Sequence, residues 1–413
     1  MSDWLIRKRL EEKKMKKTVN HNQTIVACFV AYIVQAIINN FVPLLFLTFQ
    51  STYGISLNKI TLLVTFNFGI QLLVDLLSVK FVDRIGYRVC VILAQVFAAM
   101  GLIGLTIFPN MMGDPFVGLL LSVAIYAVGG GLLEVLVSPI VEACPTERKE
   151  GVMSLLHSFY CWGHVGVVLL STVFFGVVGI ENWKYLAWIW ALIPLLNALN
   201  FTRVPIASLL AEGEKGLSLG ELVRNRLFWI MMLLMVCAGA CEQGISQWAS
   251  AFAEMGLGVS KTVGDLAGPL LFATLMGASR VFYGKYSEKI KLEKFMALSA
   301  VLCMISYLMA SLTKSPVLGL AGCGLCGLSV GIMWPGTFSM ASAGIRGGGT
   351  AMFALLALAG DLGCSGGPTF VGMISEAMGE NLKKGILAGV VFPVLLLIGL
   401  YLNMRVRGSG AEK

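Results

Sequence analysis

The stretch "VKFVDRIGYR", residues 79–88, is a short charged turn between two long apolar segments. Three basic residues and one aspartate lie within it, whereas the segments at about 60–82 and 89–108 are apolar over most of their length. A membrane-spanning helix needs about 20 apolar residues. The stretch therefore predicts two spanning helices that are joined by a tight loop on one side of a membrane.

The whole chain has the composition of a membrane protein. Its 413 residues are 57% hydrophobic and 13% charged, with a mean hydropathy of +0.82, whereas soluble domains are about 25% charged. The first apolar run is too long for the core of a signal peptide, so we expect it to remain as a spanning helix. No stretch fits a soluble catalytic domain, and the protein is not expected to be an enzyme.

Twelve segments are long and apolar enough to span a membrane, which predicts an all-α fold. They lie at about 24–49, 60–82, 89–108, 116–140, 152–178, 184–202, 227–253, 264–286, 295–313, 316–342, 349–375 and 385–404. A polar stretch divides them six and six. The expected parts are a basic cytoplasmic segment at 1–23, a six-helix bundle at 24–202, a cytoplasmic linker at 203–226, a second six-helix bundle at 227–404 and a cytoplasmic tail at 405–413.

The basic residues predict the orientation of the chain. With the N-terminus inside, 24 of the 31 lysines and arginines fall on the inner side and six in the outer loops. Cytoplasmic loops are enriched in these residues, so both termini are expected to be cytoplasmic. The net charge of +8 is spread over short loops. It indicates anchoring at a lipid bilayer rather than binding to nucleic acid.

The two halves of the chain resemble repeats. "SEKIKLE" at 287–293 follows "VDRIGYR" at 82–88 by about 205 residues, and Pro139 and Pro335 occupy similar places in helices 4 and 10. Transporters built from repeated bundles bind their substrate near the membrane midplane, between the halves. The repeat therefore predicts a transporter with a central site.

The loop at 79–88 resembles the signature between helices 2 and 3 of the major facilitator superfamily, G-x-x-x-D-R-x-G-R-[RK]. The matching residues are Asp83, Arg84, Gly86 and Arg88. Val79 and Tyr87 depart from the signature, and the second half carries a degraded copy that includes Gly284 and Glu288. The resemblance implies two six-helix bundles that rock about a central site, and a gating role for the loop residues.

Three further stretches resemble the fucose permease group of sugar:proton symporters within that superfamily. They are "GGGLLEVLVSPIVE" at 129–142, "LLHSFYCWG" at 155–163 and "NNFVPLL" at 39–45. The aspartate of this group in helix 1 is an amide here, Asn39 or Asn40. The resemblance implies proton-coupled uptake of a sugar or a sugar derivative.

Five charged side chains lie well inside predicted helices. They are Asp75, Glu134, Glu242, Arg280 and Asp361. Such a group costs about 2.5–3.5 kcal/mol in a membrane and generally faces a cavity or a partner. Glu134 lies on a stripe of small and polar residues and is the first candidate to carry a proton. Arg280 needs a carboxylate partner, which can be Glu242 or Asp361.

Helix 5 adds a face of titratable and aromatic residues. His157, Tyr160 and His164 share one side of the helix, and Trp162 lies beside them. Histidine can bond to sugar hydroxyls or relay protons near neutral pH. The sequence therefore assigns both histidines to solute binding and, with Glu134 and Glu242, to proton coupling. Plain interhelical hydrogen bonds are the alternative for the histidines.

Amides and indoles complete the predicted solute site. Amides can bond to the edge of a polar ring, and an indole can cover its face. The residues assigned to solute contact, besides Glu134 and those of helix 5, are Gln35, Asn39, Asn40, Gln243, Gln247, Trp248 and Trp334. The residues assigned to gating or to contact between the bundles are Asp75, Asp83, Arg84, Gly86, Arg88, Arg280, Glu288 and Asp361.

The sequence therefore predicts a proton-coupled symporter of a small polar solute, active as a monomer in a bacterial cytoplasmic membrane. No cofactor or metal is expected, because the ten cysteines are surrounded by apolar residues. An exporter of amphipathic or drug-like compounds in the same fold is the alternative, and it predicts a more apolar, aromatic cavity. An intramembrane enzyme and a sensor fit the repeat and the short linker less well.

Overall fold

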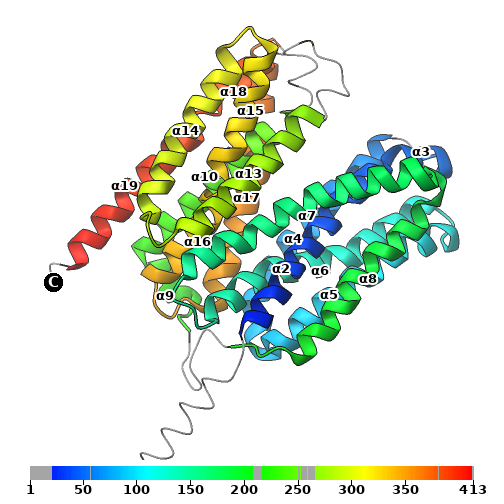
Figure 1. Cartoon of the computed structure of the whole chain (residues 1–413), viewed down its shortest axis with the longest axis horizontal. Coiled ribbons are helices and arrows are strands. Elements are labelled where there is room, and N and C mark those ends of the chain that lie inside the picture. Colours follow the sequence, from blue (N-terminus) through cyan, green and yellow to red (C-terminus); the bar gives the residue numbers. More distant parts are fainter. Residues whose placement is uncertain are drawn as a thin grey trace, which may run out of the picture.

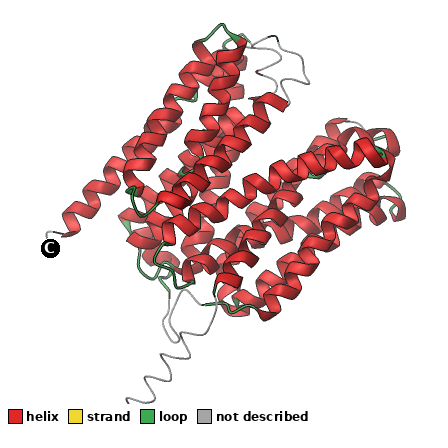
Figure 2. Ribbon diagram, viewed as in Figure 1, coloured by secondary structure: helices red, strands yellow, loops and turns green. Residues whose placement is uncertain are grey.

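The computed structural model describes residues 21–55, 57–207, 216–249, 252, 258, 266–379 and 381–411, apart from a few side chains that include that of Asp83. Most of the predicted segment at 1–23 and part of the linker lie outside these residues. Every secondary-structure element in the described part is helical (Figure 2). The predicted all-α fold is confirmed.

The helices of the first bundle follow one another with short connections. They are α2 (Asn22–Asn40), η1 (Val42–Leu45), α3 (Phe46–Tyr53), α4 (Leu57–Ile85), α5 (Tyr87–Met111), α6 (Pro115–Ala143), α7 (Lys149–Val178), η2 (Ile180–Asn182) and α8 (Trp183–Arg203). Proline at the start of η1 separates α2 from α3 within the first predicted span, because its ring removes a backbone donor and fixes φ.

A short helix, α9 (Leu219–Arg224), precedes the second bundle. Ser218 and Glu221 form its capping box, and the bonds from Ser218 lower the pKa of the exposed Glu221 carboxyl. The second bundle comprises α10 (Arg226–Ser246), the π-helical turn η4 (Leu266–Leu270), α13 (Leu271–Tyr286), α14 (Leu292–Leu312), α15 (Pro316–Val330), α16 (Met333–Gly344), α17 (Gly349–Ala377), α18 (Leu382–Ala388) and α19 (Val391–Ala411).

The described helices include 10 segments that are long and apolar enough to cross a membrane. The 29-residue helix α4 and the pair η4 and α13 take the two other positions at which the sequence predicts a span. The chain is therefore a multi-pass membrane protein of two six-helix bundles. Its exposed leucines, valines and phenylalanines, such as Leu73, Phe81 and Leu199, lie where lipid would cover them.

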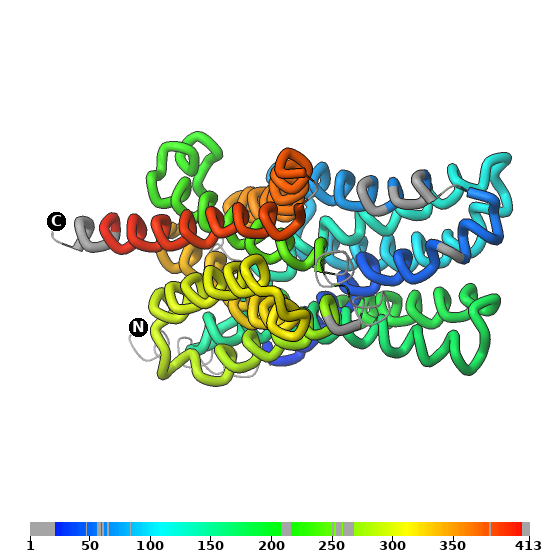
Figure 3. The backbone as a smooth tube through the Cα atoms, turned by 90° about the horizontal axis from the view of Figure 1, so that it is seen from above, coloured from blue at the N-terminus to red at the C-terminus, as the bar shows by residue number. Residues whose placement is uncertain are grey.

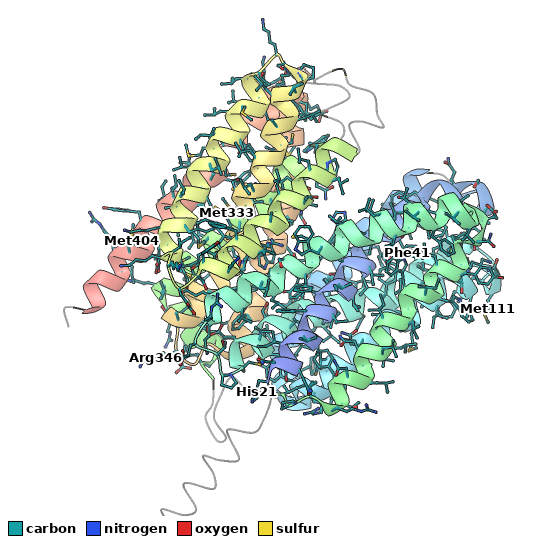
Figure 4. All side chains as sticks on the ribbon, in the orientation of Figure 1. His21, Phe41, Met111, Met333, Arg346 and Met404 are labelled. Atoms are coloured by element: carbon teal, nitrogen blue, oxygen red, sulfur yellow. The ribbon has the colours of Figure 1, made fainter. Side chains whose placement is uncertain are left out.

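The two bundles converge at one end of the molecule and diverge at the other (Figure 1). Seen from above, the helices of the first bundle lie mostly to one side and those of the second mostly to the other (Figure 3). The convergent end carries His21 and Arg346, and Met111 lies at the opposite end of the first bundle (Figure 4). Between the bundles, α7 packs against α13 and α16, and α4 and α6 pack against α17. These contacts define the two interfaces on which the site is built, α4–α17 and α7–α13.

Small residues allow the helices to approach closely. A Cβ on Gly151 of α7 would lie 2.8 Å from the carbonyl oxygen of Gly284 of α13, across the bundles. Within the second bundle, a Cβ on Gly367 would lie 2.7 Å from the carbonyl oxygen of Ala240. Packing of this kind is how membrane helices associate where the hydrophobic effect is weak.

Gly86 separates α4 from α5 and has a φ of 92°. Residues with a Cβ rarely adopt this conformation, whereas glycine does so readily. The tight turn expected from the sequence at 79–88 therefore depends on glycine at this position.

Candidate solute and proton site

The first-bundle half of the site is a series of hydrogen-bonded amides that ends on Glu134. Gln35 on α2 donates to Oε2 of Glu134 on α6 and to Oε1 of Gln71 on α4, both at 3.0 Å. Gln71 and Asn67 each donate to Oδ1 of Asn39 at 3.0 Å. Three helices are thus tied around one carboxylate, and amides offer donors and acceptors that a hydroxyl-bearing solute can use.

The glycines before Glu134 make room for α4. A Cβ on Gly130 would lie 3.1 Å from Cδ of Gln71, and a Cβ on Gly131 would lie 2.9 Å from Cβ of Val74. Larger residues would push α4 away from α6. The glycines therefore keep Gln71 within reach of Gln35, and through it of Glu134.

His157 on α7 is buried beside this network. Its Nε2 lies 3.4 Å from the hydroxyl of Tyr32 and 3.3 Å from that of Ser138. Its ring also contacts Phe338 of the second bundle, with centroids 5.9 Å apart. Tyr32 in turn interacts electrostatically with Glu134. His157 thus bonds to side chains of α2 and α6 and lies beside the polar network.

The other helix-5 candidates divide into two groups. The Tyr160 hydroxyl lies beside the side chains of Asn39 and Asn40, at the edge of the amide network. Trp162 is 38% exposed and lies against α13 instead. His164 is half-buried, and none of the hydrogen bonds found between described residues involves it.

Arg280 on α13 is buried and bonds to both bundles. Its Nη2 lies 3.4 Å from Oε2 of Glu242, and its Nε donates to the carbonyl oxygen of Gly331 at 2.8 Å. Its Nη1 donates to the carbonyl oxygen of His157 and to Sγ of Cys161, each at 3.0 Å. Of the two carboxylates that the sequence offers to Arg280, Glu242 is therefore the partner.

The amides of α10 extend this ion pair along the helix. Gln243 donates to Oε1 of Glu242 at 3.3 Å, and Gln247 donates to Oε1 of Gln243 at 2.9 Å. The carboxylate thereby receives bonds on both oxygens, one from a guanidinium and one from an amide. The second bundle thus contributes its own series of hydrogen-bonded polar side chains, which ends at Glu242, the acid paired with Arg280.

The two candidate tryptophans of the second bundle face α17. The indole nitrogen of Trp248 donates to the carbonyl oxygen of Pro368 at 3.0 Å. The Trp334 ring is 7% exposed and lies over Gly360, where a Cβ would overlap it. Both rings pack within their own bundle, so the described arrangement offers only small parts of them to a solute.

Four carboxyl groups and one guanidinium share the centre of the molecule. Glu134 interacts electrostatically with Asp361 and Glu242, and Asp75 interacts with Asp361 and Glu134. Glu242 is the one that holds Arg280. Like charges repel strongly where the effective dielectric constant is low. Among the described residues, Glu242 is the member of this cluster with a cationic partner, so the centre gathers more acidic than basic groups.

Contacts between the bundles close the convergent end. Arg148 at the start of α7 lies 3.0 Å from Oε1 of Glu288, and it also donates to the carbonyl oxygens of Gly284 and Lys285 at 3.0 Å. Ser342 on α16 donates to Glu142 on α6 at 2.9 Å. The predicted gating residue Glu288 is thus part of a latch whose other half, Arg148, the sequence analysis did not single out.

The signature residues at 83–88 act mostly inside the first bundle. Arg88 donates to two carbonyl oxygens in the last turn of α8, at 2.7 and 3.1 Å, where a cation is favoured by the helix dipole. Arg84 is exposed, and the Asp83 side chain lies outside the described part. Tyr87, which departs from the signature, hydrogen-bonds to Thr350 across the bundles.

A cavity of about 440 Å³ lies between the bundles at the convergent end. Its charged lining residues are Glu142, Glu147, Arg148, Lys149, Glu150 and Glu288. Neither Glu134 nor Arg280 lines it. It is therefore a vestibule beside the latch, separate from the central polar cluster.

The fold and this polar centre fit a known family, and the family model of the Major Facilitator Superfamily matches residues 24–368. The chain belongs to this superfamily. Its predicted membership is confirmed.

Solved structures share the fold at low sequence identity. A variant of the Escherichia coli fucose:proton symporter FucP superposes with a TM-score of 0.76 at 18% identity, covering 92% of this chain and 98% of that one. The proton:xylose symporter XylE superposes with a TM-score of 0.76 at 11% identity, covering 93% and 95%. FucP in its outward conformation gives a TM-score of 0.75 at 16% identity, covering 92% and 98%.

A curated relative is the membrane protein MosC of Rhizobium meliloti. It is 26% identical over 263 residues, which cover 63% of this chain and 62% of MosC. The chain thus matches less than two thirds of the length of this relative.

Sequence reasoning missed most of the α4 contribution to the site. Asn67, Gln71, Asp75 and Ser78 are all buried, and they recur every three or four residues on one side of α4. A polar stripe at helical spacing within an apolar segment was the available signal. It was overlooked because only the ionisable member, Asp75, was considered.

Proposed function

We propose that this transporter takes up a sugar or another small hydroxyl-bearing solute together with protons. The observation that carries the proposal is the hydrogen-bonded network of amides around Glu134, opposite the bonded pair of Arg280 and Glu242. Amide groups suit the mixed donors and acceptors of a polyol. The two solved neighbours named as sugar:proton symporters, FucP and XylE, support this solute class.

Glu134 carries the transported proton in this proposal. It is half-buried, it accepts a hydrogen bond from Gln35, and it faces two other acids through electrostatic interactions. The helix-1 acid of the fucose permease group is an amide here, Asn39 or Asn40, and an amide cannot take up a proton. The proton therefore stays with Glu134, and Glu242 remains paired with Arg280. In this proposal His157, which contacts the Tyr32 hydroxyl, assists proton movement.

The membrane orientation is part of the same proposal. The convergent end carries His21 and Arg346 (Figure 4), and the basic residues of the chain are concentrated on the side that those residues mark. By the positive-inside rule that end faces the cytoplasm, so the bundles diverge toward the outside. The protein is proposed to work in this way as a monomer in a bacterial cytoplasmic membrane, with both termini inside. An exporter of amphipathic compounds would need an apolar, aromatic cavity. The central amides and acids form a polar cluster instead.

The test is uptake of a panel of labelled sugars into proteoliposomes, with and without an imposed pH gradient. The wild-type protein is expected to accumulate one of them at least tenfold when the inside is alkaline. The variant Glu134→Gln keeps the acceptor for Gln35 but cannot release a proton. It is expected to lose accumulation while still exchanging labelled for unlabelled solute across the membrane.

The matched control is Glu181→Gln, a change of the same kind at an exposed residue. It should accumulate solute as the wild type does. Transport by the wild type that ignores the pH gradient would overturn proton coupling, and accumulation by Glu134→Gln would overturn the role of Glu134. A panel in which no hydroxyl-bearing solute moves would overturn the solute class.

A further inference from the structure

Two acids from different bundles meet in the interior of the protein. Asp75 lies on α4 and Asp361 on α17, and these helices pack against each other across the bundles. Their carboxyl groups lie close enough to interact directly. We call Asp75 and Asp361 the carboxyl pair. The sequence analysis assigned both residues to gating, with no contact between them.

Asp75 has no other way to satisfy its charge. Its side chain is 0% exposed. Among the described residues, no donor group bonds to either of its carboxylate oxygens. The central acids Glu134 and Glu242, by contrast, accept hydrogen bonds from Gln35 and from Gln243 and Arg280. The carboxyl pair is thus the place where a buried acid has only another acid to bond to.

A hydrogen bond between two carboxyl groups requires a proton, because an ionised carboxylate only accepts. Two carboxylates held this close share one proton, since both cannot be ionised together. A metal ion is a poor alternative occupant, because no group of three or more His, Cys, Asp or Glu side chains that could hold one occurs among the described residues.

The charged side chains around the carboxyl pair also favour binding of a proton there. From α6, Glu134 adds a negative charge that acts on Asp75, and from α10, Glu242 adds one that acts on Asp361. Arg280 on α13 is bonded to Glu242. α5, which also contacts α4, carries one charged residue, Arg88, and this bonds to α8. The charges that face the carboxyl pair are therefore negative ones.

We propose that Asp75 and Asp361 form a proton-binding site that exists only while α4 and α17 are packed together. A ligand that binds one of two conformations stabilises that conformation. Binding of the proton therefore holds the convergent end closed. Its loss leaves two like charges facing each other and drives the two helices apart.

This site deepens the proposed proton coupling, because it adds a second proton to the one on Glu134. The proton is held while the divergent end is open. It is released when the bundles separate at the convergent end and the carboxyl pair breaks. Release is thus tied to the conformational step itself.

The test measures the separation of the bundles by pulsed electron paramagnetic resonance, without solute. Spin labels are placed on Lys80→Cys of α4 and Arg346→Cys before α17, both exposed positions. Nine of the native cysteines are buried, and the half-buried Cys364 is changed to alanine in every variant. The labelled parent protein should show a short-distance and a long-distance population. The ratio of the short-distance to the long-distance population should fall about tenfold for each unit by which the pH rises through the titration range, because the change from one to the other releases one proton.

Substitutions then assign the effect to the carboxyl pair. In Asp75→Asn and in Asp361→Asn an amide donates to the remaining carboxylate, so the short-distance population should persist and change less than twofold over the same range. Glu376→Gln, an exposed position on the same helix as Asp361, should retain the response of the parent.

Three results would overturn the proposal: a parent protein whose distances ignore pH, asparagine variants that keep the full response, and a response that follows sodium concentration at constant pH. The first and third need no substitution within the pair, so a variant that fails to fold leaves the test intact. Since no solute is present, failure here would leave the proposal for the solute and for Glu134 standing.

Discussion

The two interfaces between the bundles occupy equivalent places in the repeat but have opposite chemistry. Asp75 lies seven residues before the loop at 82–88, and Arg280 lies seven residues before the loop at 287–293. At α4–α17, Asp75 meets the carboxyl of Asp361. At α13–α7, Arg280 meets a carbonyl oxygen and a thiol of α7 while it bonds to Glu242.

The two interfaces differ in whether the groups in contact can gain or lose a proton. A guanidinium stays protonated at all accessible pH values, so the α7–α13 interface keeps its hydrogen bonds whatever the pH. The carboxyl pair can gain and lose its proton. One interface therefore keeps its contacts whatever the pH, whereas the proposed proton on the carboxyl pair makes the other depend on pH.

Removal of Arg280 should be the most damaging single change to this arrangement. Arg280→Ala leaves Glu242 buried without its cation and deletes the bonds to His157, Cys161 and Gly331. Breaking a buried pair in this way costs about 3–5 kcal/mol. The thermal unfolding midpoint of the purified protein should fall sharply, and transport should be lost.

A second substitution tests the reason for that loss. Arg280→Ala combined with Glu242→Gln removes the unpaired charge, so the double variant should be more stable than Arg280→Ala alone. Arg346→Ala, the loss of an exposed arginine, should shift stability by less than about 0.5 kcal/mol. Equal stability of the single and double variants would show that the loss does not come from the unpaired charge of Glu242.

Much of the fold follows from the sequence because the bilayer imposes simple rules. Apolar length predicts the spans and the repeated loops predict the two bundles, and α4 at Leu57–Ile85 matches the run expected at about 60–82. The identity of the Arg280 partner could not be predicted, since α10 and α17 both present an acid and only their packing decides between them. The contact between Asp75 and Asp361 could not be predicted from the sequence for the same reason. Its two members are far apart in the chain, and no local pattern brings them together.

The loops that follow the two interfaces also differ, and substitutions there should have an intermediate effect. Gly86 caps α5 with a φ of 92°, whereas its repeat equivalent, Lys291, caps α14 with a φ of −64°. Gly86→Lys forces a side chain into a left-handed conformation, at a cost of about 1–2 kcal/mol.

The reverse change, Lys291→Gly, should cost less than half as much, because Lys291 adopts an ordinary conformation. Thermal unfolding of the two variants side by side measures the difference. Equal losses would mean that the turn between α4 and α5 does not need glycine, and that the asymmetry between the repeats lies elsewhere.

The smallest effect is expected at the latch. Arg148 and Glu288 lie 3.0 Å apart, but their side chains are 43% and 64% exposed. Exposed ion pairs contribute about 0.2–1 kcal/mol and are screened by salt. Glu288→Gln should therefore reduce the closed population, measured with the spin labels at positions 80 and 346, by no more than about fivefold. The reduction should shrink in high salt.

Arg148 keeps its bonds to the carbonyl oxygens of Gly284 and Lys285 in this variant, so the pH response of the distances should be unchanged. A Glu288→Gln variant that lost the pH response would place proton control at the latch instead of at the carboxyl pair.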